Sequence, residues 1–161
     1  MAVHLGILSD SHGQADRTRR AIEALQAAGA TRFVHCGDVE TEQVLDQLAG
    51  LDAHVVFGNC DPARSLGRYA DRLGLQVHHP MGRWQVDGRS IAFTHGDDPD
   101  LLQAAIDERA DFLLHGHTHV RADTQVGATR VINPGALHRA RPFTVALLVP
   151  ATGELRSITV D

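Results

Sequence analysis

The stretch 3–13, with the sequence VHLGILSDSHG, sets the pattern on which the rest of the chain is built. A short apolar run stops abruptly at polar residues, which is typical of a buried strand that runs into a loop. We therefore predict a strand over residues 1–9, with Asp10 and His12 directly beyond its end. Residues 16–28 then carry apolar side chains at helical spacing, so the first unit of the chain is strand, loop and helix.

The same unit recurs in the next part of the chain. The predicted elements are a strand at 32–35, a helix at 41–49 capped by Thr41, and a strand at 52–57. Strands that alternate with helices form a parallel sheet, and such sheets bind ligands beyond the carboxyl ends of their strands. Because Asp10, Asp38 and Asn59 all follow predicted strands, we expect their side chains at one edge of this sheet.

Hairpin signals become frequent later in the chain. Asp87-Gly88 separates apolar stretches at 84–86 and 90–94, and this dipeptide is typical of a tight β-turn. The remaining predicted elements are a short helix at 65–73, an extended piece at 76–79, a helix at 100–109, and strands at 112–114, 122–126, 129–132, 143–149 and 155–160. We predict an α/β fold with two stacked mixed sheets and helices outside, a four-layer α-β-β-α sandwich formed by a single domain over residues 1–161.

The composition is ordinary for a globular protein and disfavours several classes of function. Hydrophobic residues make up 43% of the chain, but no apolar run approaches the length of a membrane span. The first residues enter a strand pattern without a basic leader, so we expect a cytoplasmic protein. The net charge of -5 argues against a surface for nucleic acid, and the absence of lysine excludes Schiff-base lysine chemistry.

Cysteine and histidine are the residues whose chemistry needs an explanation. Cys36 and Cys60 are expected to be free thiols, with Cys36 a small core residue. The chain has 11 histidines, more than a core requires. Four of them are expected at the surface or in loops, namely His4, His54, His78 and His79.

Seven polar side chains at predicted strand ends have the chemistry of metal ligands. They are two aspartates, one asparagine and four histidines: Asp10, His12, Asp38, Asn59, His95, His117 and His119. Mixed oxygen and nitrogen ligands suit Mn, Fe, Zn or Co, and the lack of cysteine among them disfavours a structural zinc site. Any one of these residues alone is more often a cap, a surface residue or a buried residue. The ordered set predicts a site for two metals that share one carboxylate.

These motifs also carry a family resemblance, which runs from Asp10 to Asn133. The series Asp10-x-His12, Gly37-Asp38, Gly58-Asn59, His95-Gly96 and Gly116-His117-x-His119 resembles the calcineurin-like metallophosphoesterase superfamily. The short chain and the motif Gly58-Asn59-Cys60-Asp61 resemble its small phosphodiesterase branch, which is related to the metallophosphoesterase-fold subunit of the retromer coat. The resemblance implies an α/β sandwich and a metal-dependent phosphoric ester hydrolase.

The resemblance also implies a role for each member of the set. Asp10, His12 and His119 would hold one divalent ion and Asn59, His95 and His117 the other, with Asp38 bridging them. Manganese is the expected metal, with Fe, Zn, Co or Ni as alternatives. Two such ions polarise phosphoryl oxygens and lower the pKa of the water that attacks phosphorus. The amide nitrogen of Asn59 has a second role open to it, as a donor to a phosphoryl oxygen.

The main departure from the family pattern is Cys60, where many larger members carry a histidine that protonates the leaving oxygen. A thiol is a weak donor, so we predict hydrolysis of a small phosphodiester and a dependence on a good leaving group. Asn59, Cys60 and Asp61 are the catalytic candidates, with Asp61 orienting that side of the site. The loop at 133–135 resembles one that the branch places near the site.

Some residues beside the motifs keep two interpretations. His35 and His115 are either partners that support the ligands or ordinary core and loop residues. His138, followed by Arg139 and Arg141, either reaches a substrate phosphate or forms a solvated basic turn, and the basic turn is the simpler interpretation.

Three alternative functions remain at this stage. A phosphomonoesterase of the same fold would use the same metals. A non-catalytic, retromer-like scaffold is disfavoured because all seven positions keep metal-competent side chains. A nuclease is disfavoured by the acidic balance and small size. The branch often forms oligomers, so a homo-oligomer is open.

Overall fold

Eleven strands and four helices follow one another along the chain, which the computed structural model describes from residue 1 to residue 161. In chain order they are β1 (Leu5–Leu8), α1 (Ala15–Ala27), β2 (Arg32–His35), α2 (Glu42–Asp46), β3 (Ala53–Val55), α3 (Ala63–Arg72), β4 (Gln76–Val77), β5 (Met81–Val86), β6 (Arg89–Thr94), α4 (Pro99–Asp107), β7 (Phe112–Leu114), β8 (Ala122–Val126), β9 (Thr129–Asn133), β10 (Phe143–Val149) and β11 (Glu154–Val160).

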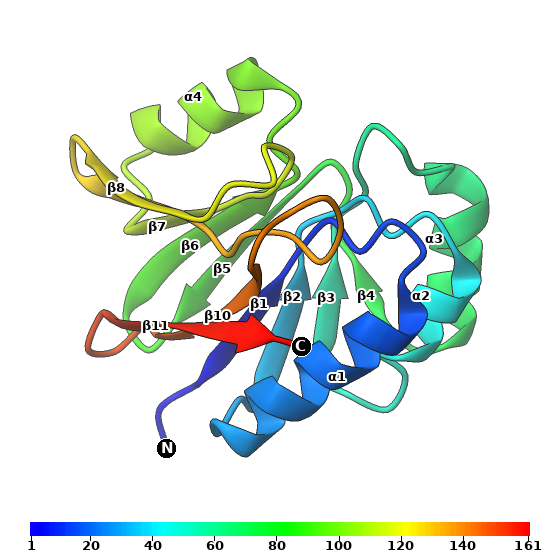
Figure 1. Ribbon diagram of the computed structural model, residues 1–161. Coiled ribbons are helices and arrows are strands. Elements are labelled where there is room, and N and C mark those ends of the chain that lie inside the picture. Colours follow the sequence, from blue (N-terminus) through cyan, green and yellow to red (C-terminus); the bar gives the residue numbers. More distant parts are fainter.

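The first sheet has six strands in the order β11-β10-β1-β2-β3-β4 (Figure 1). Strands β1 to β4 are parallel, as expected for strands joined by helices, while β10 and β11 add to the β1 edge as an antiparallel pair. The C-terminal strands therefore join the sheet that begins the chain, which makes it mixed.

The second sheet has five strands in the order β5-β6-β7-β9-β8. The predicted Asp87-Gly88 hairpin is confirmed: both residues have positive φ, 50° and 76°, and Val86 pairs with Arg89. Strand β7 is parallel to β6 and β9, and β8 is antiparallel to β9. The sheet is therefore mixed as well.

The hydrophobic core forms three layers, which confirms the four-layer α-β-β-α sandwich. Alternation within β1 sends Leu5 and Ile7 into the layer between the sheets and Leu8 toward the helices. The outer layer on the first sheet is completed by α1, α2 and α3, and α4 covers the second sheet through Ala105. No helix combines the length and apolar character that crossing a membrane requires.

Several predictions about individual segments need correction. Helix α2 covers only Glu42–Asp46, although Thr41 caps it as predicted, with its hydroxyl 3.4 Å from the Val44 N–H. His54 is not a surface residue. It lies in β3 with 4% exposure, its Nε2 donates to Asp52, and its Nδ1 lies 2.9 Å from His78 Nε2. Strand β5 begins at Met81 because residues 81–83 also pair with β6.

The carboxyl ends of five parallel strands open toward one place in the sandwich. The loops after β1, β2 and β3 come from the first sheet, and those after β6 and β7 from the second. This confirms the expectation that Asp10, Asp38 and Asn59 gather at one edge of a parallel sheet, and it adds the predicted histidines from the facing sheet.

Candidate metal centre

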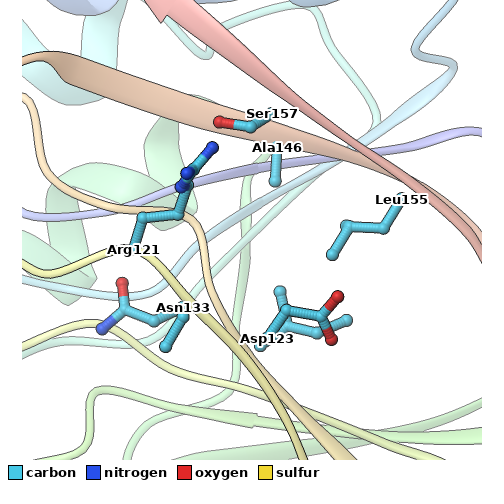
Figure 2. Close-up of a pocket in the computed structure, with 8 residues that line it drawn as sticks. Arg121, Asp123, Asn133, Ala146, Leu155 and Ser157 are labelled. Carbon is cyan, nitrogen blue, oxygen red and sulfur yellow. The ribbon is translucent and has the colours of Figure 1, made fainter.

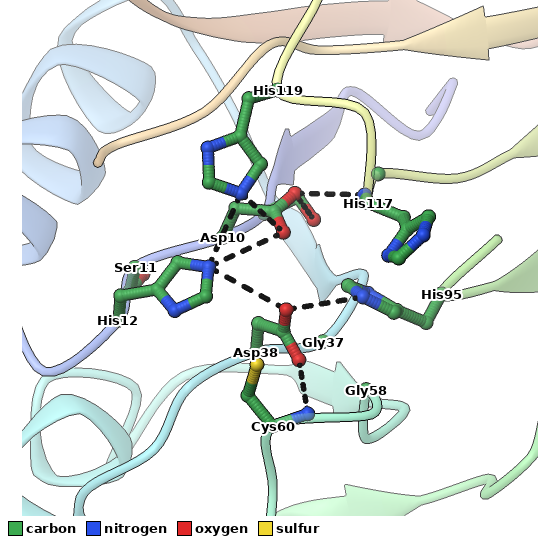
Figure 3. Close-up of polar contacts among 12 residues, drawn as sticks. Asp10, Ser11, His12, Gly37, Asp38, Gly58, Cys60, His95, His117 and His119 are labelled. Carbon is green, nitrogen blue, oxygen red and sulfur yellow. Dashed lines mark hydrogen bonds and ion pairs between the residues drawn. The ribbon is translucent and has the colours of Figure 1, made fainter. Parts of the chain in front are cut away.

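All seven predicted ligand residues meet where these five loops converge, and Figure 3 shows six of them: Asp10, His12, Asp38, His95, His117 and His119. Two sets of three among these residues have potential ligand atoms within 4.8 Å of one another, and they are Asp10, His12 and His119, and Asp38, His95 and His117. A third set joins His12 to Glu40 and Cys60. The seventh residue, Asn59, places its Oδ1 3.1 Å from His95 Nε2. Two adjacent clusters of oxygen and nitrogen atoms result.

Asp10 carries the clearest sign that the centre is built for a cation. Its Oδ2 accepts hydrogen bonds from Ser9 Oγ at 2.7 Å and from the His117 N–H at 3.0 Å. Its Oδ1 is buried without a hydrogen-bond donor and lies 3.3 Å from His119 Nε2. A buried carboxylate oxygen without a donor is costly unless a cation compensates it.

Two histidines are oriented by hydrogen bonds on the ring nitrogen that faces away from the centre. His12 Nδ1 donates to Glu40 at 2.7 Å, and His95 Nδ1 donates to the Cys36 carbonyl at 2.8 Å. In each neutral ring this leaves Nε2 as an acceptor that faces the other ligands. Histidines that bind metals are held in this way.

Ring nitrogens and carboxylate oxygens lie close together where the two clusters meet. His12 Nε2 lies 3.2 Å from His119 Nε2 and 3.4 Å from Asp38 Oδ2. Asp38 Oδ2 also lies 3.2 Å from His95 Nε2, which puts this oxygen between the two clusters. Lone pairs at these distances repel unless protons or metal ions lie between them. The residues present thus fit divalent metal ions, and Asp38 Oδ2 lies near ring nitrogens of both clusters.

The electrostatics of Asp38 agree with a position between cations. Burial alone would raise its pKa, but the contact with His95, when that ring is protonated, and the hydrogen bond from the Cys60 N–H hold the pKa at about 2. Burial would lower the pKa of His95, and its contact with Asp38 raises that pKa instead. The carboxylate is therefore charged at neutral pH and attracts positive charge.

Backbone strain concentrates at the same place. Nine non-glycine residues have positive φ, and seven of these are in or beside the centre: Asp10, His12, Asp38, Glu40, His117, His119 and Arg139. Such conformations cost energy in L-residues and persist where the surrounding structure holds them, commonly at functional sites. They turn the chain sharply enough for neighbouring side chains to share one point.

Two glycines allow the loops to approach the carboxylates. A Cβ at Gly58 would collide with Asp38 Oδ1, and one at Gly116 would collide with Ser9 Oγ and lie 2.5 Å from Asp10 Oδ2. Glycine is thus required at these two positions because a side chain would collide with the neighbouring residues, and not only because the backbone turns there.

Gly116→Ala is expected to lower manganese affinity and kcat/KM by roughly 10- to 100-fold, because the new methyl group displaces the Asp10 carboxylate from its supporting donors. Metal analysis and hydrolysis assays on the purified variant measure both effects. Gly67→Ala is the matched control, since its Cβ would make only an ordinary 3.7 Å contact with Phe57. A Gly116→Ala protein with wild-type metal content and activity would contradict this account of the loop.

The three catalytic candidates have different positions. Asn59 and Cys60 line a pocket of about 540 Å³ beside the ligands. The Cys60 thiol is exposed, and burial and the nearby Asp38 raise its pKa, so it stays protonated at neutral pH. Asp61 does not line the pocket, and its carboxylate accepts from the N–H groups of Val39, Glu40 and Gly58. Asp61 therefore positions the loops and does not face a substrate.

The same pocket corrects the interpretation of His138. Both His138 and Arg139 line it, and the His138 ring lies 5.1 Å from the His12 ring, centroid to centroid. The basic turn is part of the wall of the centre and not simply solvated. Burial and the neighbouring His12 lower the pKa of His138.

The supporting histidines lie behind the ligands. His35 is buried, its Nε2 donates to Ser11 Oγ at 2.8 Å, and its Nδ1 accepts from the Gly37 N–H, so it ties the loops after β1 and β2 together. Burial lowers its pKa to about 3, which keeps it neutral. His115 Nδ1 donates to the Gly116 carbonyl. Asn133 Nδ2 donates to the same carbonyl, so the loop at 133–135 does support the site.

Sequence reasoning missed Glu40, the partner of His12. Its only sequence signal is a carboxylate two positions after Asp38, and acidic residues in loops are common. The contact depends on positive φ values at both His12 and Glu40, which no local pattern reveals.

A separate pocket of about 370 Å³ opens between the edges of the two sheets (Figure 2). It is lined by Arg121, Ala122, Asp123, Ile132, Asn133, Ala146, Leu155 and Ser157. None of the seven predicted ligands lines it, and Asn133 contacts the metal centre only through the loop that it supports. The potential metal ligands therefore lie at the converging loops and not in this second pocket.

Several known proteins are similar to this chain in sequence and in fold. A phosphodiesterase from Methanocaldococcus jannaschii is 29% identical over 136 residues, which cover 81% of this chain and 82% of that protein. A probable metallophosphoesterase from Bacillus subtilis is 30% identical over 145 residues, covering 84% of this chain and 75% of that protein. A solved structure of an archaeal phosphodiesterase matches with a TM-score of 0.88 and 26% identity, covering 98% of this chain and 99% of that one.

More distant structures agree in fold alone. Vacuolar protein sorting 29 of Cryptosporidium parvum matches with a TM-score of 0.62 at 15% identity, covering 98% of this chain and 96% of that one. The model of the calcineurin-like phosphoesterase superfamily domain matches residues 3–153, a range that holds all five ligand-bearing loops. The chain therefore belongs to the calcineurin-like phosphoesterase superfamily, a family of metal-dependent hydrolases.

Proposed function

We propose that this protein is a dinuclear metal-dependent phosphodiesterase that hydrolyses a small phosphodiester at the converging loops. The observation that carries the proposal is the buried Asp10 Oδ1, which has no hydrogen bond and lies among ring nitrogens of His12 and His119 and next to the Asp38 cluster. The M. jannaschii phosphodiesterase supports the reaction class. A catalytic function is favoured over a non-catalytic scaffold because all seven ligand positions keep suitable side chains and the hydrogen bonds that orient His12 and His95 are formed.

In this proposal each cluster holds one divalent ion, most suitably manganese. Asp10, His12 and His119 hold the first, Asn59, His95 and His117 hold the second, and Asp38 is shared. Bound there, the ions polarise the phosphoryl oxygens and lower the pKa of the attacking water.

The remaining residues of the pocket bind and orient the ester. The Arg139 guanidinium offers a charged fork to the phosphoryl oxygens. The Asn59 amide nitrogen, whose contact with Cys60 Sγ is a long 3.8 Å, is free to donate to the same group. Because the Cys60 thiol is a poor proton donor, the geometry favours diesters with a good leaving group over monoesters.

Exhaustive chelation is expected to abolish hydrolysis of bis(p-nitrophenyl) phosphate, and Mn²⁺ is expected to restore it, because Cys60, the cysteine that lines the pocket, has a raised pKa and stays a protonated, weak nucleophile at neutral pH. Rates are measured on the same protein before chelation, after chelation and after reconstitution. Full activity in protein shown by elemental analysis to be metal-free would overturn the proposal.

A phosphomonoesterase of the same fold is the alternative enzyme. Comparing bis(p-nitrophenyl) phosphate with p-nitrophenyl phosphate keeps the leaving group constant. A higher kcat/KM for the diester is expected, and a clear preference for the monoester would favour the alternative.

A further inference from the structure

Three arginines without acidic partners gather beside the metal centre. Arg121, Arg139 and Arg141 line a pocket of about 480 Å³, and no aspartate or glutamate lines it. All three side chains are exposed, and none donates a hydrogen bond or forms an ion pair within the chain. In a chain with a net charge of -5, this is a local concentration of uncompensated positive charge.

The acid nearest to these arginines in sequence is already neutralised by another residue. Asp123 binds Arg130 through both carboxylate oxygens, at 2.8 and 2.9 Å. Arg121 belongs to the chain just before β8, and Figure 2 shows its side chain and that of Asp123 directed to different parts of the pocket between the sheets. Arg121 is therefore left to attract a charge from outside the chain.

The arginine pocket adjoins the pocket of the metal centre. His119 and Arg139 line both, so the two spaces meet at a proposed metal ligand. A molecule with its phosphodiester at the metals would extend past His119 into the arginine pocket. Val120, which is 63% exposed, adds an apolar surface to the arginine pocket next to His119.

The chemistry of the pocket points to phosphate. Guanidinium groups bind phosphate oxygens through paired N–H donors, and several of them match a dianion better than a carboxylate. Repulsion among three cations in one concavity is relieved when such an anion binds.

We propose that the arginine pocket binds a second phosphate group of the substrate, so that the preferred substrate is a phosphodiester with a further phosphate on one of its alcohols. This inference rests on the proposed phosphodiesterase function. It assigns Arg121 and Arg141 to substrate selection, whereas Arg139 faces both pockets.

The kinetic test uses two chromogenic diesters that differ by one group: the 5′-p-nitrophenyl ester of thymidine monophosphate and the same ester with a 3′-phosphate. The Mn²⁺-loaded wild type is expected to prefer the second by at least roughly tenfold in kcat/KM, the value of one charged hydrogen bond. In an Arg121→Ala/Arg141→Ala variant the ratio is expected to fall close to one. Arg156→Ala is the control, because Arg156 is exposed and unpaired on the same protein but lines neither pocket.

A binding measurement separates the two proposals. Calorimetric titration of the Mn²⁺-loaded protein with thymidine 5′-phosphate and with thymidine 3′,5′-bisphosphate reports on the pocket without turnover of a diester. Tighter binding of the bisphosphate than of the monophosphate, lost in the double variant, supports the inference. This holds even if neither ester is cleaved, a result that would contradict only the phosphodiesterase proposal. Equal affinities and equal kcat/KM values, or a preference that remains in the double variant, would contradict the proposed role of the arginine pocket. The proposed phosphodiesterase function would be unaffected.

Discussion

Asp38→Asn is expected to lower kcat/KM for bis(p-nitrophenyl) phosphate on the order of a thousandfold, since shared metals supply several kcal/mol of transition-state stabilisation. Asparagine keeps the shape and can still accept from the Cys60 N–H, so the loop should hold. It removes the charge that lies 3.2 Å from His95 Nε2 and 3.4 Å from His12 Nε2. An amide NH₂ would instead donate to these nitrogens and occupy the space of a cation.

The control for this variant is Asp97→Asn, the same carboxylate-to-amide change in a loop beside the centre. Asp97 is exposed and forms no hydrogen bond or ion pair, so wild-type activity is expected. Metal content and activity are measured for both proteins. An Asp38→Asn enzyme that keeps wild-type metal content and most of its activity would show that Asp38 is not the shared ligand.

Cys60→His is expected to raise hydrolysis of p-nitrophenyl phosphate by roughly 10- to 100-fold, within the range that a positioned proton donor contributes. An imidazole titrates near neutral pH, whereas the thiol keeps its proton because burial and Asp38 raise its pKa. Cys60 is exposed at the pocket wall, which leaves room for the larger ring. Hydrolysis of the diester is expected to change less, because the leaving group is the same and the diester carries one negative charge fewer for an imidazolium to stabilise.

Cys60→Ser is the matched control, since it replaces the thiol by a small hydroxyl with no group that titrates near pH 7. Rates for the monoester and the diester are compared in the three proteins at equal manganese content. A gain in the serine variant as large as in the histidine variant, or no gain in either, would remove Cys60 from the explanation of diester preference.

Much of the fold could be predicted because hydrophobic periodicity is local. The apolar run of β1 and the Asp87-Gly88 turn both identify their elements within a few residues. The pairing of β10 with β1 could not be predicted, because it joins segments at opposite ends of the chain. The burial of His54 could not be predicted either, because its partners His78 and Trp84 come from other segments, just after β4 and in β5.

The members of the candidate site were predictable from their place at strand ends, whereas its geometry was not. Asp10 and His119 are far apart in the sequence, and only the stacked sheets bring the carboxylate oxygen within 3.3 Å of the ring nitrogen. Glu40, Arg121 and the pocket role of His138 depend on loop conformations with no sequence pattern of their own.

The two stacked sheets explain how this fold brings the two ligand clusters together. The first sheet supplies both carboxylates, and the second supplies His95, His117 and His119 from the facing side. Each half of the sandwich thus contributes to both clusters, and Asp38 Oδ2 lies where they meet. Packing between the sheets therefore sets the spacing of the ligands.

Anomalous diffraction at the manganese edge, from crystals of the protein grown with Mn²⁺, tests the central claim most directly. We predict two peaks roughly 3.5 to 4 Å apart. One should lie among Asp10, His12 and His119 and the other among Asn59, His95 and His117, with the Asp38 carboxylate between them. A single peak, no peak, or manganese bound away from these residues would contradict the dinuclear centre.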